Sequence, residues 1–478
     1  MANLETKNLN FGGIADSDYI GSENSVAEMV NCDIHSEAGL IKANQALVKD
    51  SGAVVDELCQ AKVPCSNGST YFFGDSGGIF ERQSNGTWTD RGTVAPAAGA
   101  AKVLSAREYR GYIYYSTQNR LGRIAVPAAG GSWAGRDDNW ATFGVGNATY
   151  HPMEIVNLVL YIGDGNQVAQ VDNTTFSANA LDITTPLIIS ALGRLDTDLL
   201  IGTIVASNVM RSEIIRWNTW SVSFSVSDPI PEVGINAFLD TDNIVVVSAG
   251  KKGNLYIYDG AQLETYKKIK GTWSSTNKAV VYPEAVFNFN GMPLFGLSID
   301  TGTGVNLGVY SLHRTNRNYP YVLNLEFTIS TGNRTNVVIG AIVPIGADQF
   351  LVSWKDTTSG TLYGVDIMSL TAKATAHFVT RNYLIDRTNL SNYGFVYVPY
   401  RSLPASTSID IHTSTQHAAF SGTPDTSKDD TDRLMQVSDA HIGEASVAKI
   451  KVVLNPNAND APEVEMASIG FDETQPSD

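Results

Sequence analysis

The stretch SNGTWTDRG, residues 84–92, is echoed by KGTWSSTNK at residues 270–278. Between the two echoes lie GGSW, DNTTF and RWNTW, so a polar turn residue, Ser or Thr, and an aromatic residue recur along the chain. The aromatics of this series are Trp88, Trp133, Phe176, Trp220 and Trp273, with looser matches at Phe327 and Phe378. Their spacings are 45, 43, 44, 53, 54 and 51 residues. Recurrence at a period of this size predicts a repeat architecture.

Each aromatic follows two β-rich runs separated by a Gly, Asn and Asp-rich turn, which is typical of a β-hairpin. The first runs are YFF, YIYY, LVLYI, LLIGTIV, IVVV, LFGLSI and FLVSW, and they begin at residues 71, 112, 158, 199, 244, 294 and 350. The second runs are GIFER, RIAVP, QVAQV, EIIRW, LYIYD, LGVYSL and LYGVDI. LDTD occurs at residue 195 and again at 239, 44 residues later and in phase with the hairpins.

Three or four short strands per unit at this period predict the blades of a β-propeller. We expect about seven blades, because seven hairpins are found. We also expect Trp88, Trp133, Trp220 and Trp273 to be buried at equivalent positions between blades.

The composition agrees with an all-β fold. The chain has 478 residues, of which 43% are hydrophobic, only 17% are charged and 42 are Gly, a balance typical of turn-rich β proteins. Its formal charge of −16 argues against a broad electrostatic contact with nucleic acid.

The cysteines and the chain start predict a soluble protein made in the cytoplasm. Cys32, Cys59 and Cys65 match no zinc-binding spacing; Cys59 and Cys65 could pair, but isolated buried thiols in a reducing compartment are favoured. MANLETKNLNFGG lacks the pattern of a signal peptide, and no apolar run reaches the roughly 18 residues that a membrane span needs.

The repeats end near residue 385, and alternating strands follow. In VAKIKVVL, one face carries Ala448, Ile450, Val452 and Leu454 while Lys449 and Lys451 share the other. The sequence therefore predicts an N-terminal arm at 1–45, a propeller at 46–388 and a small sandwich-like C-terminal β domain at 389–478.

The two ends of the chain carry a family resemblance. The motif residues at the start are Gly12, Gly13 and Ile14, then Asn31, Cys32 and Asp33, then Gly39, Leu40 and Lys42. This opening resembles that of propeller-type tail proteins of tailed bacteriophages, which begin with Gly-Gly-Ile/Leu and a short helix ending in Asn-x-Asp, although their usual RPG is replaced here by KANQA. The strand KIKVVL, a polar turn with Pro462, and ASIGF are similar to the closing β domain of the same group.

The sequence of the N-terminal arm is compatible with several ways of packing. Ser22 offers an N-cap for a short amphipathic turn, and the preceding residues hold few apolar side chains. The arm could fold back over the propeller, add one strand that closes the ring, or dock onto a neighbouring subunit.

Two pairs of acidic residues are the candidates for catalysis or metal binding. The pairs Asp196/Asp198 and Asp240/Asp242 could serve as glycosidase carboxylates or calcium ligands. Because each pair precedes a strand, turn residues that bond their own backbone are the favoured interpretation. GDSGGIFERQSNGTW holds the ingredients of a sialidase Asp-box turn, but in the wrong order.

Other motifs are also without a catalytic pattern. The histidines are scattered, with no HExxH, and no Ser lies in G-x-S-x-G. GDGNQ at 163–167 lacks the Lys of a phosphate-binding loop, and the basic clusters at 266–271 and 314–318 are interpreted as solvated faces or subunit contacts. We therefore predict no catalytic, cofactor-binding or metal-binding residue, no cofactor and no enzymatic activity.

The resemblance implies a structural virion protein of a phage tail, synthesised in the host cytoplasm. It would assemble with itself into a ring and with other tail proteins, as part of the nozzle or conduit through which DNA passes at ejection without specific binding. The alternatives are a receptor- or glycan-binding propeller at the tail tip and a glycan-cleaving propeller enzyme.

Overall fold

The computed structural model of the chain describes residues 2–7, 12–19, 24–37, 39–205, 211–241, 244–313, 321–384, 391–431, 436–438 and 443–473. The chain divides into two compact units. The propeller unit comprises Val48–Val309 and Ile329–Ile367, and the terminal unit comprises Met1–Leu47, Tyr310–Thr328 and Met368–Asp478. Each unit is thus built from separate segments, whereas the predicted ranges 1–45, 46–388 and 389–478 follow the order of the chain.

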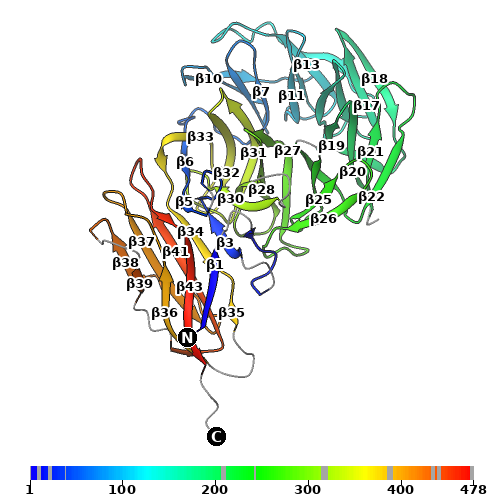
Figure 1. Cartoon of the computed structure of the whole chain (residues 1–478). Helices are drawn as coiled ribbons and strands as arrows, with labels where there is room; N and C mark the ends of the chain where they lie inside the picture. The colour runs from blue at the N-terminus through cyan, green and yellow to red at the C-terminus, as the bar shows by residue number, and fades with distance from the viewer. Residues whose placement is uncertain are drawn as a thin grey trace. The chain divides into compact units, whose positions relative to one another are not determined.

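The propeller unit consists of antiparallel sheets that succeed one another along the chain (Figure 1). Six sheets have four strands. They are β7 (Cys59–Pro64) to β10 (Trp88–Thr93), β11 (Ser105–Tyr109) to β14 (Asp137–Thr142), β15 (Met153–Val156) to β18 (Thr175–Asp182), β19 (Leu187–Leu195) to β22 (Val226–Ile230), β23 (Ile235–Asp240) to β26 (Leu263–Lys268), and β31 (Val337–Ile345), β32 (Gln349–Asp356) and β33 (Leu362–Lys373) with β6 (Gln45–Lys49). A long hairpin of β27 (Lys278–Phe289) and β28 (Met292–Thr301) lies between the fifth and sixth of these sheets in the chain.

The first strands of these sheets form a closed ring. Contacts run from β7 to β11, β15, β19, β23, β27 and β31, and from β31 back to β7. The start of the unit meets its end: the Asp50 N–H donates to the Val365 carbonyl over 2.9 Å, and the Val365 N–H donates to Ser51 Oγ over 3.0 Å. The fold class is therefore a β-propeller, as the repeat pattern predicts.

The hydrophobic core lies between neighbouring sheets. One cluster joins Tyr71 and Phe73 of the first sheet to Ile113, Tyr115 and Trp133 of the second, all of them buried. The second strand of each sheet, such as β8 (Thr70–Gly74), has a neighbouring sheet packed on each of its faces. Its sequence is therefore a continuous apolar run rather than an alternation of apolar and polar residues. Fourth strands such as β10 are polar and largely exposed.

The predicted hairpins are confirmed. The seven first runs lie in β8 (Thr70–Gly74), β12 (Tyr112–Ser116), β16 (Val159–Asp164), β20 (Asp198–Val205), β24 (Val245–Ala249), β28 and β32. The seven second runs lie in β9 (Gly78–Arg82), β13 (Arg120–Ala125), β17 (Gln167–Asp172), β21 (Ser212–Trp217), β25 (Asn254–Tyr258), β29 (Gly308–His313) and β33.

The prediction that the four tryptophans are buried at equivalent positions is wrong. Trp88 starts β10 and is half-buried, and Trp133 is buried in the connection between β13 and β14. Trp273 lies after β26, and Trp220 lies in the turn after β21 with 83% of its surface exposed. In RWNTW the buried ring is Trp217, because it ends the strand on its inward face and donates from Nε1 to the Ser221 carbonyl over 2.8 Å.

The terminal unit is also all-β. One sheet pairs β1 (Ala2–Lys7), β43 (Met466–Glu473), β36 (Ser391–Val398) and β39 (Gln436–Ser438), with β40 (Gly443–Ala445) also on β36. A second runs in the order β29, β30 (Val322–Phe327), β3 (Ser25–Val30), β34 (Ala376–Thr380), β41 (Val447–Asn455), β37 (Ser408–Thr415) and β38 (Thr426–Asp429), with β2 (Gly13–Ile14) on β3 and β35 (Tyr383–Leu384) on β41. A third joins β4 (Cys32–Asp33), β5 (Ile41–Ala43) and β42 (Glu463–Val464).

The amphipathic turn predicted after Ser22 is wrong. Ser22 lies outside the described residues, and Ser25–Val30 forms β3, which pairs with β34 on one side and with β2 and β30 on the other. Because neighbours on both sides satisfy its backbone, this apolar stretch is stable as an interior strand. The alternation predicted for VAKIKVVL is confirmed in β41, where Ile450 and Val452 are buried and Lys449 and Lys451 are partly exposed.

Candidate functional site

Charged residues of the first strands meet at the axis of the propeller ring. Each sits in the strand that precedes a predicted hairpin, at intervals of 40 to 47 residues. They are Lys62, Arg107, Glu154, Arg194, Asp240 and Glu284. Since first strands line the axis of a propeller, their polar side chains face one another across it.

Glu284 of β27 is the centre of a buried ion network. Lys62 Nζ lies 2.9 Å from Glu284 Oε2, and Arg107 Nη1 donates to both carboxylate oxygens over 2.7 and 2.8 Å. Ser105 Oγ donates to Oε1 over 2.8 Å. Only 3% of the Glu284 side chain is exposed, so its carboxylate is shielded from solvent within the network.

The network keeps Glu284 ionised. Burial alone would raise the pKa of its carboxyl, but the charges of Arg107 and Lys62 lower it to about 2. Burial lowers the pKa of Lys62 although Glu284 opposes this. Burial raises the pKa of Glu154, which stands near the same charges.

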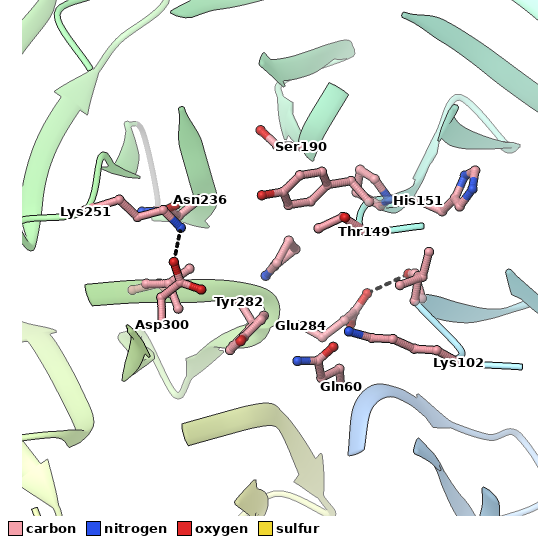
Figure 2. A pocket seen from close by; sticks show the side chains of 17 residues that line it. Gln60, Lys102, Thr149, His151, Ser190, Asn236, Lys251, Tyr282, Glu284 and Asp300 are labelled. Carbon is pink, nitrogen blue, oxygen red and sulfur yellow. Dashed lines mark hydrogen bonds and ion pairs between the residues drawn. The ribbon is translucent and has the colours of Figure 1, made fainter. Parts of the chain in front are cut away.

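A pocket of about 230 Å³ opens on one side of this network. Figure 2 shows Lys251 and Asp300 on one side of it and Lys102 on the opposite side. Lys251 Nζ lies 3.1 Å from Asp300 Oδ2, so these two charges compensate each other. Glu284 forms part of the lining.

Neutral polar groups complete the lining. Asn236 Nδ2 donates to the Gly250 carbonyl over 2.7 Å, and Ser190 Oγ donates to the Ile235 carbonyl over 2.6 Å, which fixes both side chains. Burial raises the pKa of Tyr282 to about 12 and that of Tyr150 in the same direction. Both phenols therefore keep their protons, and the pocket offers hydroxyl and amide groups to a ligand.

His151 borders the pocket but is held by the protein. Its Nδ1 lies 2.8 Å from the Gly163 carbonyl, its Nε2 accepts from the Asn147 N–H over 3.2 Å, and its ring stacks on Phe143 at 4.2 Å. Burial lowers its pKa, which favours the neutral ring. A structural role accounts for these contacts.

A smaller pocket of about 170 Å³ includes Lys62 and Arg107 in its lining. Glu154 and Arg194 also line it. Pro283 borders both pockets, and Glu284 contacts Lys62 and Arg107 directly, so the ion network separates the two pockets along the axis.

The acid pairs singled out in the sequence are dispersed: Asp196 lies in a turn, Asp198 starts β20, and Asp240 ends β23 and lines the smaller pocket. Asp196 has a left-handed φ of 53° in the two-residue turn between β19 and β20. Asp198 accepts from Arg216 Nε over 2.5 Å, and Asp240 lies 3.6 Å from Arg194 with both side chains more than half exposed. Asp198 thus bonds a side chain, unlike the backbone bonding expected. Asp242 lies outside the described residues.

The cysteines and the turn at 163–167 are parts of the folded core rather than functional sites. Cys32, Cys59 and Cys65 are free and buried, so the pairing of Cys59 with Cys65 does not occur. In 163–167, Asp164 is buried and accepts from the backbone N–H groups of Val145 and Gly146 over 2.9 and 2.7 Å. The cluster 266–271 has a partly exposed face, and 314–318 lies outside the described residues.

Sequence reasoning missed the axial residues. Lys62, Arg107 and Glu284 lie in strands that were not predicted; Lys62 and Glu284 are single charges among apolar neighbours, whereas Arg107 is followed by Glu108. The signal that could have found them is the recurrence of a charged residue just before six of the seven hairpins.

The described part of the chain shows neither a metal-binding cluster nor a membrane-spanning helix. No group of three or more His, Cys, Asp or Glu side chains able to hold a metal ion is present among these residues. Within the same residues, no helix is long and apolar enough to cross a membrane.

No family model and no curated protein matches this chain. Solved structures that resemble it include the extracellular domain of BT4673 from B. thetaiotaomicron, with 14% identity, a TM-score of 0.48 and coverage of 74% of this chain but 44% of that one. The WD40 β-propeller domain of Doa1 has 11% identity and a TM-score of 0.46, with 68% and 97% covered. The β-propeller domain of Cps50 (Swd1) from Myceliophteria thermophila has 12% identity and a TM-score of 0.43, with 69% and 100% covered. From its own strand order and closed ring, the chain is a β-propeller protein with a second all-β unit.

Proposed function

We propose that this chain is a structural protein of a bacteriophage tail, forming an oligomeric ring that is part of the nozzle or conduit for genome ejection, and that it is not an enzyme. One observation carries the proposal. The segments that resemble propeller-type tail proteins come from both ends of the sequence, and they build one unit. Gly13–Ile14 is β2, Cys32–Asp33 is β4, KIKVVL lies in β41 and ASIGF lies in β43.

The motif residues have specific structural roles in that unit. Gly13 has a φ of +56°, and a Cβ there would lie 2.2 Å from the Val322 side chain, so only Gly fits. Asn31 has a left-handed φ of 55°, and its Oδ1 accepts from the Thr328 N–H over 2.8 Å. Asp33 Oδ1 accepts from the His35 and Ser36 N–H groups over 2.9 and 3.0 Å. These residues hold turns that join the sheets of the terminal unit.

The propeller axis itself is not the proposed conduit. The Glu284 network joins strands on opposite parts of the ring, and the adjoining pocket of about 230 Å³ is the size of a small molecule, not of a duplex. The conduit would lie on the axis around which several copies of the chain assemble.

Oligomeric state tests the proposal. We expect the purified full chain, or the intact particle that contains it, to show a closed ring of copies by light scattering after gel filtration and by negative-stain electron microscopy. A chain that is monomeric alone and sits in a peripheral fibre of the particle would overturn the proposal.

A second candidate is a receptor- or glycan-binding propeller. The axial pocket, with its polar lining and two tyrosines, favours it. A monomeric chain with saccharide affinity would support this candidate over the first.

A further inference from the structure

The larger pocket, called the axial pocket, is lined by two lysines, Lys102 and Lys251, and two carboxylates, Glu284 and Asp300. Lys251 is compensated by Asp300, and Glu284 is shared by Lys62 and Arg107, so the network holds two cations for one carboxylate. Lys102 adds a further cation to the lining. A lining cation that has no carboxylate partner among the described residues, while the other charges of the lining are paired, points to an anionic ligand.

Lys102 is the lysine of this pocket whose charge is not paired with a described carboxylate. No described carboxylate lies within ion-pair distance of its Nζ, and its side chain is only partly exposed. Burial lowers its pKa, and Asp75 is the acid that acts against this lowering. An anion placed beside Nζ would supply the charge that the protein does not place there.

The other groups of the pocket match hydroxyls. The Asn236 amide is fixed by its bond to the Gly250 carbonyl, which leaves Oδ1 as an acceptor. Tyr282 and Tyr150 offer phenol groups and ring surface, and Gln60 and Thr149 add further donors and acceptors. Figure 2 shows Gln60, Thr149, Asn236 and Tyr282 around the pocket.

The volume limits the ligand to a small one. About 230 Å³ is below the range of roughly 300–1,000 Å³ that is usual for drug-sized ligands. A phosphate ligand fits the lining less well, because protein phosphate sites use Arg forks, helix N-termini or backbone nests, and the lining offers single lysines.

We propose that the axial pocket binds a monosaccharide-sized hydroxylated carboxylate, such as a uronic acid, with the carboxylate on Lys102 and the hydroxyls on Asn236, Tyr150 and Tyr282. This inference goes beyond the tail assignment and does not depend on it, since the pocket lies within a single propeller unit.

Calorimetric titration of the full chain with D-glucuronate tests the proposal. We expect saturable binding that is at least tenfold tighter than that of D-glucose, which lacks the carboxylate. K102M should weaken glucuronate binding at least tenfold. The matched control is K252M, which removes the same charge from Lys252, an exposed residue that follows Lys251 in the chain. This variant should leave the affinity for glucuronate unchanged.

Two further measurements keep the test decisive. Y282F removes one hydroxyl only, and it should weaken glucuronate binding several-fold while the melting temperature stays within a few degrees of wild type. The proposal is overturned if wild-type protein does not bind glucuronate, if K252M loses as much affinity as K102M, or if inorganic phosphate or glucose binds as tightly as glucuronate. None of these readouts involves ring formation, so their failure is distinguishable from failure of the tail proposal.

Discussion

At the residue scale, Glu284 is the buried charge with the largest structural consequence. E284Q would leave Lys62 and Arg107 buried without a counter-charge, and breaking such a pair costs about 3–5 kcal/mol. We expect a clear fall in the free energy of unfolding, measured with urea at pH 7. E264Q is the matched control, because Glu264 is exposed on β26, and it should change stability by about 0.5 kcal/mol or less.

The same carboxyl predicts a pH dependence. The pKa of Glu284 is lowered from its usual 4.5 to about 2 in the folded protein, so the unfolded chain takes up its proton first as the pH falls. Its contribution to stability is therefore complete above about pH 4.5 and is lost as the pH falls toward 2. Wild-type melting temperatures should decline more steeply in this window than those of E284Q; parallel curves would contradict the assignment.

Two tryptophans from the same sequence series separate core from surface. W133A removes a ring that packs on Tyr71 and Phe73 and is 2% exposed, and such losses cost about 3–5 kcal/mol. W220A removes an 83% exposed ring and should cost about 0.5 kcal/mol or less. Urea unfolding of the two variants measures this difference, and similar losses in both would show that the turn after β21 is packed.

At the element scale, the second and third strands of each propeller sheet could be predicted from the sequence, whereas the first and fourth strands could not. Second strands such as β8 and β16 are covered on both faces, so their sequences are apolar runs bounded by turn residues. First strands interrupt that pattern with residues such as Lys62 and Glu154, which face the axis. Fourth strands such as β10 are polar on both faces, so no periodicity marks them.

The axial site and β3 escaped prediction for a related reason. The ion network joins residues from β7, β11 and β27, which become neighbours only when the ring closes. β3 is six residues long, and its neighbours β30 and β34 come from distant parts of the chain. Tertiary pairing, rather than local propensity, decides its conformation.

Deletion of the N-terminal segment tests the role of β3. Removing residues 1–38 takes away an interior strand of the second sheet of the terminal unit, so the backbones of β30 and β34 lose their partner. We expect an insoluble chain, or one that has lost an unfolding transition. Removing residues 1–7 deletes only the edge strand β1 and should lower the melting temperature modestly. A 1–38 deletion that melts like wild type would show that β3 is dispensable and would favour an assembly role for the segment.

At the scale of the whole molecule, the charge balance sets the expected behaviour toward DNA. A surface of net charge −16 repels a polyanion over about a Debye length, roughly 8 Å at physiological salt. A protein that lines a DNA conduit and binds the phosphate groups of DNA would slow the passage of a genome. We expect no duplex binding in a gel-shift assay at 0.15 M salt; a shift that falls steeply with added salt would instead indicate phosphate contacts.

The pairing of β3 with β34 has a consequence for biosynthesis. Glu28 and His377 face each other over 3.1 Å although 349 positions separate them in the chain. A ribosome adds about 5–20 residues per second, so β3 waits tens of seconds for its neighbour to leave the exit tunnel. The five propeller sheets from β7 to β26, whose strands are close in sequence, can condense during that interval. Maturation of the terminal unit therefore comes late in synthesis, and only a chain translated past β43 can complete it.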